Sequence, residues 1–232
     1  MEAKKLSKEK LEEVKKAISQ ANAKRAEEKK QKQLLEKRIQ EITEFGVRID
    51  NRYFASDLKF AVEHGISLPL RNIQAVLTAL AENKISATPE TIKMLLFTRS
   101  LGLDLGHCFA QLADCVAGGV IPEEMLKYRI SRDSRKILSG VVVAAVLDKK
   151  ISEDLFEFLL QGKKITFVSP GDYSPVVKAC IEGELSLHVL DYLIADKSSF
   201  SVEDWKMMYE SGIDFLVQAY LREFYPEIEV DF

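Results

Sequence analysis

The feature that most constrains the fold of this chain is a helix-start signal that recurs along most of its length. An apolar residue is followed by Ser, Asp or Pro, and a helical pattern of apolar residues comes next. Ser and Asp side chains accept hydrogen bonds from first-turn amides that have no partner in the helix, and Pro is tolerated there. The pattern therefore predicts a series of short helices. The signals are Ile66–Ser67, Ile85–Ser86, Leu103–Asp104, Ile121–Pro122, Ile130–Ser131, Ile151–Ser152, Val168–Ser169, Leu185–Ser186 and Phe200–Ser201.

The spacing of these signals predicts that the helices come in pairs. The first four signals are 19, 18 and 18 residues apart, and the last four are 17, 17 and 15 residues apart. A pair then takes about 35 residues, the period of helical repeat arrays such as tetratricopeptide-like stacks. No tetratricopeptide, ankyrin or leucine-rich signature is present. We predict an all-α fold with about eleven stacked short helices over residues 47–225, as either a helical-repeat array or an irregular α-domain.

Two stretches rich in β-branched residues are the exceptions to this helical pattern. Residues 140–147 have the composition of a strand, but we predict a helix there because Ser131 precedes it as a cap and residues 147–150 end it like the other helices. Residues 164–168 are compatible with an extended segment. They lie in the longest predicted loop, residues 161–175.

Residues 1–46 read as a charged N-terminal helix that ends at Gly46. Its heptad seam is apolar at both ends and charged at three central positions, so a coiled coil is predicted only in part. We expect residues 34–44 to pack on the body and residues 1–33 to be exposed, with self-association as a candidate role. Residues 1–40 hold thirteen Lys or Arg and seven Glu, whereas residues 41–232 hold twenty Lys or Arg and twenty-nine Asp or Glu. The seam is Leu11, Val14, Ile18, Ala21, Arg25, Glu28, Lys32, Leu35, Ile39 and Ile42.

The cysteines and the chain ends favour an intracellular, cytoplasmic protein. Cys108, Cys115 and Cys180 are odd in number and form no C-x-x-C pair, so we expect buried free thiols in a reducing compartment. No run approaches the roughly 20 apolar residues that cross a membrane, and the charged start is unlike a secretory signal. Residues 226–232 form a predicted acidic C-terminal tail.

The sequence contains no assembled catalytic or metal-binding motif. It has no phosphate-binding glycine loop, dinucleotide fingerprint, nucleophile elbow or H-E-x-x-H pattern. His64, His107 and His188 fall in separate predicted helices, and Cys108 and Cys115 are two helical turns apart, about 10 Å, too far to share one metal. We therefore predict no catalytic, cofactor-binding or metal-binding residues. The acid pairs at 123–124 and 203–204 lie at helix starts, where capping and the helix dipole explain them.

One basic cluster is a candidate binding site. Five cations fall within ten positions of an otherwise acidic body, opposed only by Asp133. In a helix, Arg129, Arg132 and Lys136 would share a face that binds phosphate, RNA or an acidic partner surface. The structural alternative is a solvated helix paired with neighbouring acids. Tyr128 is the only aromatic residue nearby that could stack on a base. The cluster is Lys127, Arg129, Arg132, Arg135 and Lys136.

The leading hypothesis from the sequence is a non-catalytic protein–protein interaction protein. A helical surface would bind a protein partner, and the basic N-terminal helix would mediate self-association or docking. The alternative hypothesis is an RNA- or nucleoprotein-associated protein that uses the basic cluster and the N-terminal arm. A third hypothesis is an enzyme whose site is assembled from dispersed residues such as His107 or Asp114. No membrane partner is expected.

Overall fold

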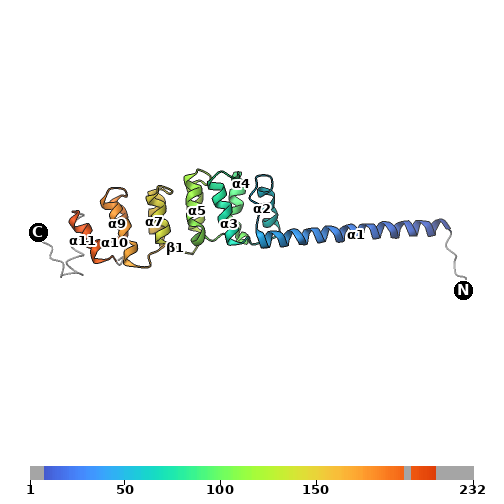
Figure 1. Cartoon of the computed structure of the whole chain (residues 1–232). Coiled ribbons are helices and arrows are strands. Elements are labelled where there is room, and N and C mark those ends of the chain that lie inside the picture. The colour runs from blue at the N-terminus through green and yellow to red at the C-terminus, as the bar shows by residue number, and fades with distance from the viewer. Residues whose placement is uncertain (1–7, 196–199, 213–232) are drawn as a thin grey trace.

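A computed structural model describes residues 8–195 and 200–212 of the chain. In this part the fold is all-α, as predicted, with short helices stacked in a row and one long helix extending from the N-terminal end of the stack (Figure 1). Two short strands, β1 (Ile137–Leu138) and β2 (Ile165–Thr166), lie among the helices. The helices are α1 (Lys8–Phe45), α2 (Phe54–Glu63), α3 (Leu70–Ala81), α4 (Pro89–Phe97), η1 (Arg99–Leu101), α5 (Leu105–Ala117), α6 (Glu123–Ser131), α7 (Ser139–Leu147), α8 (Glu153–Gln161), η2 (Pro170–Asp172), α9 (Ser174–Ile181), α10 (Leu187–Ala195) and α11 (Val202–Glu210).

The short helices form a repeat array rather than an irregular domain. Helices α3, α5, α7 and α9 begin at Leu70, Leu105, Ser139 and Ser174, which are 35, 34 and 35 residues apart. Each of them contacts the next, and α9 contacts α11. The alternate helices α6, α8 and α10 also contact one another in order. Each repeat is thus a helical hairpin whose apolar faces are covered by its neighbours.

One continuous cluster of buried side chains runs along this stack. Leu77, Phe109, Val142, Val176 and Trp205 lie on α3, α5, α7, α9 and α11, and each is almost completely buried. Burying one such aliphatic or aromatic side chain stabilises the fold by about 1.5–3 kcal/mol. Among the described helices, none is long and apolar enough to cross a lipid bilayer.

Several helix starts are capped as the sequence predicted. The Asp104 carboxylate accepts a hydrogen bond from the backbone N–H of His107 at 3.1 Å, and the Ser152 hydroxyl accepts one from the N–H of Leu155 at 3.1 Å. Ser201 and Asp204 form the predicted capping box at the start of α11. The signals therefore act through the hydrogen bonds that the first-turn amides require.

Two predicted helix starts are wrong. Ser131 does not begin the helix over residues 140–147 but is the last residue of α6, where its hydroxyl donates to the carbonyl oxygen of Tyr128 at 2.8 Å. Ser and Thr hydroxyls bond to carbonyls one turn back as readily as they cap amides, so the residue type alone does not distinguish the two ends. Ser169 precedes only the short η2, and α9 begins at Ser174.

The β-branched stretches divide between helix and strand. Helix α7 covers the residues predicted as helical in spite of their β-branched composition. Residues Ile165–Thr166 are extended and pair in parallel with Ile137–Leu138, Ile137 lying opposite Ile165. The N–H of Ile137 donates to the carbonyl oxygen of Lys164 at 2.7 Å. This short ladder connects the segment before α7 with the segment after α8.

Serines before alternate helices connect successive hairpins through polar contacts. The N–H of Ser152, before α8, donates to Glu123 at the start of α6 at 2.8 Å. The N–H of Ser186, before α10, donates to Glu153 at the start of α8 at 2.7 Å. These bonds satisfy backbone amides outside the helices and recur at corresponding places in neighbouring repeats. We call these two contacts the serine–glutamate ladder.

Helix α1 meets the body only near its C-terminal end. The residues from Glu12 to Lys37 are exposed, Ile39 is half-buried and Ile42 is buried against the core. The predicted packing of residues 34–44 is therefore confined to the part that comes after Lys37. Gly46 ends the helix with φ +83°, a left-handed conformation that favours glycine.

Candidate functional site

The predicted basic cluster spans a helix end and the loop after it. Helix α6 ends at Ser131, so Lys127 and Arg129 are helical while Arg132, Arg135 and Lys136 lie in the next segment. The helical face expected for Arg129, Arg132 and Lys136 therefore does not form. Beyond the helix end, the side chains of Arg129 and Arg135 converge on Asp133.

Asp133 is the centre of an ion-pair cluster that we call the arginine clamp, made of Arg129, Asp133, Arg135 and Asp104. The Asp133 side chain is 6% exposed and accepts from Arg129 Nη1 at 3.0 Å and from Arg135 Nη2 at 2.9 Å. Arg135 also pairs with Asp104, the cap of α5. The hydrogen bond from the Arg135 guanidinium holds the pKa of Asp133 well below its usual range. For these two arginines, the structural alternative of pairing with neighbouring acids is what the structure shows.

A cleft opens beside the arginine clamp, between the end of α4 and the end of α6. It encloses about 620 Å³. Arg99 and Arg132 are exposed on it, and neither forms an ion pair with any residue that the structure describes. The cleft therefore presents two cations that are still available to a ligand. Its lining is Leu96, Phe97, Thr98, Arg99, Gly102, Leu103, Tyr128, Arg129, Arg132, Asp133, Ser134 and Arg135.

An aromatic pair lines the same cleft. Tyr128 is 51% exposed, and its ring meets the ring of Phe97 edge to face, with centroids 5.6 Å apart and an interplanar angle of 66°. The Arg132 guanidinium lies 4.9 Å from the centre of the Tyr128 ring. Phe97 comes from α4 and Tyr128 from α6, so adjacent repeats together place two aromatic rings beside a cation.

Three of the five predicted site residues line the cleft, and two do not. Lys127 instead lies over the Phe158 ring of α8, 5.2 Å from its centre, and Lys136 is exposed outside the lining. Sequence reasoning missed Arg99 and Phe97. Since consecutive repeats are about 34 residues apart, the end of α4 and the end of α6 occupy equivalent positions. The period could have indicated that Arg99 lies beside residue 133.

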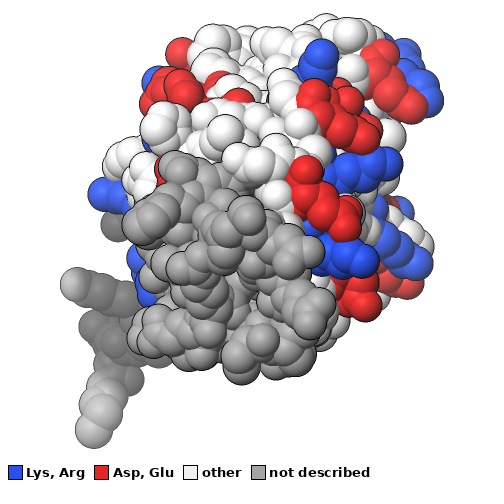
Figure 2. All heavy atoms as spheres, turned by 90° about the vertical axis from the view of Figure 1, so that its left-hand side faces the viewer, with Lys and Arg blue, Asp and Glu red and all other residues white. Residues whose placement is uncertain are grey.

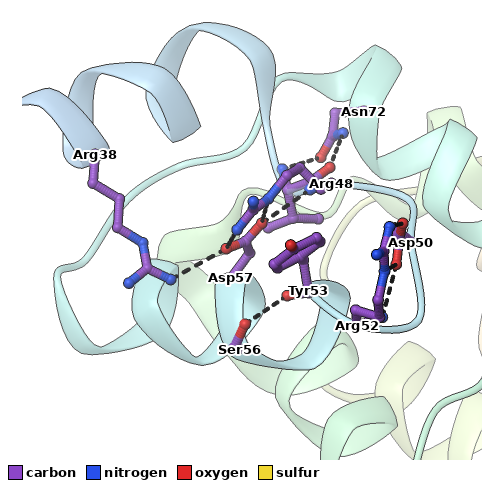
Figure 3. A network of polar contacts seen from close by, with 9 residues as sticks. Arg38, Arg48, Asp50, Arg52, Tyr53, Ser56, Asp57 and Asn72 are labelled. Carbon is purple, nitrogen blue, oxygen red and sulfur yellow. Dashed lines mark hydrogen bonds and ion pairs between the residues drawn. The ribbon is translucent and has the colours of Figure 1, made fainter.

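A second polar network, which we call the α1 bracket, fixes the long helix to the body (Figure 3). The buried carboxylate of Asp57 accepts from Arg48 Nε at 2.7 Å and from Arg38 Nη2 at 3.2 Å. Burial by itself would raise the pKa of Asp57, but the hydrogen bonds from Arg48 and Arg38 lower it on balance. Asn72 Oδ1 accepts from the N–H of Val47 at 3.1 Å, and its Nδ2 donates to the Val47 carbonyl at 3.0 Å.

Cation–π contacts complete the bracket. The Arg48 guanidinium lies 3.8 Å from the centre of the Tyr53 ring, and that of Arg38 lies 4.1 Å from the centre of the Phe60 ring. Both arginines of the bracket are thus held by an acid and a ring at once, which favours an orienting role for them over ligand binding.

The surroundings of the three cysteines favour a structural role for them over a reactive one. All three cysteines are buried and free, as predicted, and burial raises the pKa of Cys108 to about 11 and that of Cys115 and of Cys180 to about 12. Such thiols are poor nucleophiles. Within residues 8–195 and 200–212, no group of three His, Cys, Asp or Glu side chains is placed to hold a metal.

Seen from the C-terminal end of the stack, acidic and basic side chains are interspersed along one side of the molecule (Figure 2). The described side chains on that side therefore form no large patch of a single sign. Compared with known protein families, with curated proteins and with solved structures, the chain shows no match.

Proposed function

We propose that this chain is a non-catalytic interaction protein that binds a protein partner on its helical stack. A row of hairpins offers an extended surface made of many short elements, which is how repeat arrays bind their partners. Helix α1 stands away from that stack and gives a second element for self-association or docking. The α1 bracket supports this role because it fixes the direction of the helix relative to the body.

The single observation that carries the proposal is the cleft between α4 and α6. Arginine and tyrosine are enriched where binding energy concentrates in protein interfaces. Here Arg99, Arg132 and Tyr128 are exposed together in one cleft. The arginine clamp fixes the adjoining loop through Asp133, so these groups are positioned before a partner binds.

An affinity capture from lysate of the source cells, run with and without nuclease, tests the proposal. We expect a protein captured in stoichiometric amount that remains after nuclease treatment. Turnover of a substrate by the purified chain, abolished by one substitution, would contradict the proposal. Capture that disappears after nuclease treatment would also count against it, because RNA would then bridge the contact.

RNA binding is the second candidate function, and the Tyr128–Phe97 pair is the observation that favours it. Aromatic rings beside arginines stack on unpaired bases. Binding of oligouridylate would weaken steeply with salt, and replacing Arg99 and Arg132 with Glu would abolish it and reduce the salt dependence. These two arginines are better targets than Arg129 and Arg135, whose loss would also break the arginine clamp.

A further inference from the structure

We propose that the cleft between α4 and α6 binds an acidic peptide segment of the protein partner, with carboxylates on Arg99 and Arg132 and an apolar or aromatic side chain on Tyr128. This inference rests on the proposed function and names the chemistry of the partner. The four arginines of the cleft differ in whether they already pair with an acid in the described part of the chain.

Arg129 and Arg135 are occupied by the fold. Arg129 pairs with Asp133 at 3.0 Å, and its side chain is 15% exposed. Arg135 pairs with both Asp133 and Asp104. These contacts offset the charge of both arginines and tie the loop after α6 to the start of α5. A carboxylate on either arginine would compete with an existing ion pair.

Arg99 and Arg132 are the cations of the cleft that remain available to a ligand. Each is exposed, and neither has an acidic partner among the residues described by the structure. A guanidinium presents paired N–H donors that match the two oxygens of a carboxylate. Two such groups on one cleft fit a segment with two acidic side chains.

Tyr128 supplies the apolar part of the recognition. Its ring is half exposed, and it is supported by the edge-to-face contact with Phe97 and by the Arg132 guanidinium. A ring fixed in this way binds a flat or aliphatic side chain with little loss of conformational entropy. The favoured ligand therefore carries an apolar residue between or beside its carboxylates.

The charge of the whole body favours a short acidic peptide over a long nucleic acid. Residues 41–232 carry nine more acids than bases, and this net charge disfavours the approach of a long polyanion. The cleft offers two cations without an acidic partner in the described part of the chain, whereas nonspecific binding of nucleic acid rests on many phosphate contacts. A peptide whose acids are confined to a few residues needs only the cleft.

Fluorescence anisotropy with three labelled probes tests the inference. The first is a short peptide of alternating glutamate and phenylalanine, the second has glutamine in place of glutamate, and the third is an oligouridylate of similar length. We expect the native protein to bind the acidic peptide at least about tenfold more tightly than the other two. Binding of the acidic peptide should weaken as salt is raised.

Matched variants locate the binding. The double variant Arg99→Glu/Arg132→Glu should lose at least about tenfold in affinity for the acidic peptide, and Tyr128→Ala should lose a smaller factor. The control Lys59→Glu/Lys178→Glu changes the net charge equally on exposed helices outside the cleft and should bind as the native protein does. Unchanged circular dichroism and melting temperature would show that each variant is folded.

Three results of the anisotropy experiments would overturn the inference. They are no binding of the acidic peptide by the native protein, equal loss in the cleft variant and the control, or tighter binding of oligouridylate than of the peptide. If the cleft variant still captures the partner from lysate at native level, the inference fails while the proposed function stands. If the native protein captures no protein at all, the proposed function itself fails.

Discussion

At the scale of single residues, two buried carboxylates hold segments that have no regular structure. Asp57 lies between Arg38 and Arg48 in the α1 bracket, and Asp133 lies between Arg129 and Arg135 in the arginine clamp. In both places a buried acid is matched by more than one guanidinium, which offsets the cost of taking its charge out of water. Their protonation should therefore matter to stability.

Asp133→Asn should lower the free energy of unfolding at neutral pH by about 1–3 kcal/mol, because the amide no longer pairs with two guanidiniums. The pKa of Asp133 is lower in the folded chain than in the unfolded one. The stability that Asp133 contributes is therefore present above a pH of about 4 and is lost progressively as the pH falls below that value. Urea unfolding at pH 7, 4 and 3 measures this effect.

The variant should consequently lose less stability than the native protein between pH 4 and 3. Asp191→Asn, on an exposed acid of α10, is the matched control and should change neither the stability nor its pH dependence appreciably. An equal acid response in the native protein and in Asp133→Asn would show that Asp133 does not contribute in this way.

Gly46→Ala tests the contact between the end of α1 and the body. A Cβ at this position would lie 2.0 Å from Asn72 Cγ, in addition to the strain of φ +83°. We expect the free energy of unfolding, measured in urea, to fall by more than about 2 kcal/mol. Gly65 has φ +63°, and a Cβ added there would meet open space. Gly65→Ala should therefore lower the free energy of unfolding by only about 1 kcal/mol. Equal losses would mean that Asn72 moves aside freely.

At the scale of elements, the serine–glutamate ladder connects one hairpin to the next. Glu153→Ala removes the acceptor of the Ser186 N–H at the start of α10. We expect thermal unfolding to show a loss of about 1–2 kcal/mol, because a backbone amide is left without its partner. Glu90→Ala is the matched control, since Glu90 is also in the first turn of a helix but is exposed. If Glu90→Ala lowered the free energy of unfolding as much as Glu153→Ala, the effect would be assigned to the helix dipole instead.

The sequence was sufficient for elements whose signals are local. Asp104, Ser152 and Ser201 begin helices because their side chains reach amides only three residues away. The prediction for Ser131 was wrong because the segment after α6 is shaped by the pairing of Arg135 with Asp104 and by the pairing of β1 with β2, both of which join it to distant segments. Local patterns cannot contain that information.

The residues of the candidate site were also predicted only where they are neighbours in sequence. Arg129, Arg132 and Arg135 were found because they are neighbours in sequence. Arg99 and Phe97 were missed because they join the cleft through the stacking of repeats. The sequence also could not show which arginines are paired, since the contact of Arg135 with Asp104 depends on where Asp104 lies after folding.

At the scale of the whole molecule, the stack is nearly one-dimensional. Each hairpin contacts mainly its neighbours, so stability should be a sum of repeat and interface contributions rather than a property of one compact core. The C-terminal described end has its own aromatic chain. Tyr173, Phe200 and Trp205 succeed one another with ring centroids 5.0 Å apart at each step.

Trp205→Ala should therefore loosen the C-terminal end without affecting the other end. Removing a fully buried Trp costs about 3–5 kcal/mol, and this loss should fall on the interface of α11 with α9. Amide hydrogen exchange measured by mass spectrometry should show faster exchange in α9–α11 and unchanged exchange in α3 and α5.

Phe54→Ala provides the reciprocal experiment, because Phe54 is equally buried at the opposite end of the stack in α2. Faster exchange should then appear in α2 and α4, which contact each other, while α9–α11 remain protected. If either substitution accelerated exchange uniformly from α2 to α11, the repeats would unfold as one cooperative unit. In that case a partner bound at the cleft would stabilise the distant α11 as much as the adjacent α4 and α6, whereas nearest-neighbour coupling confines most of that effect to the hairpins around the cleft.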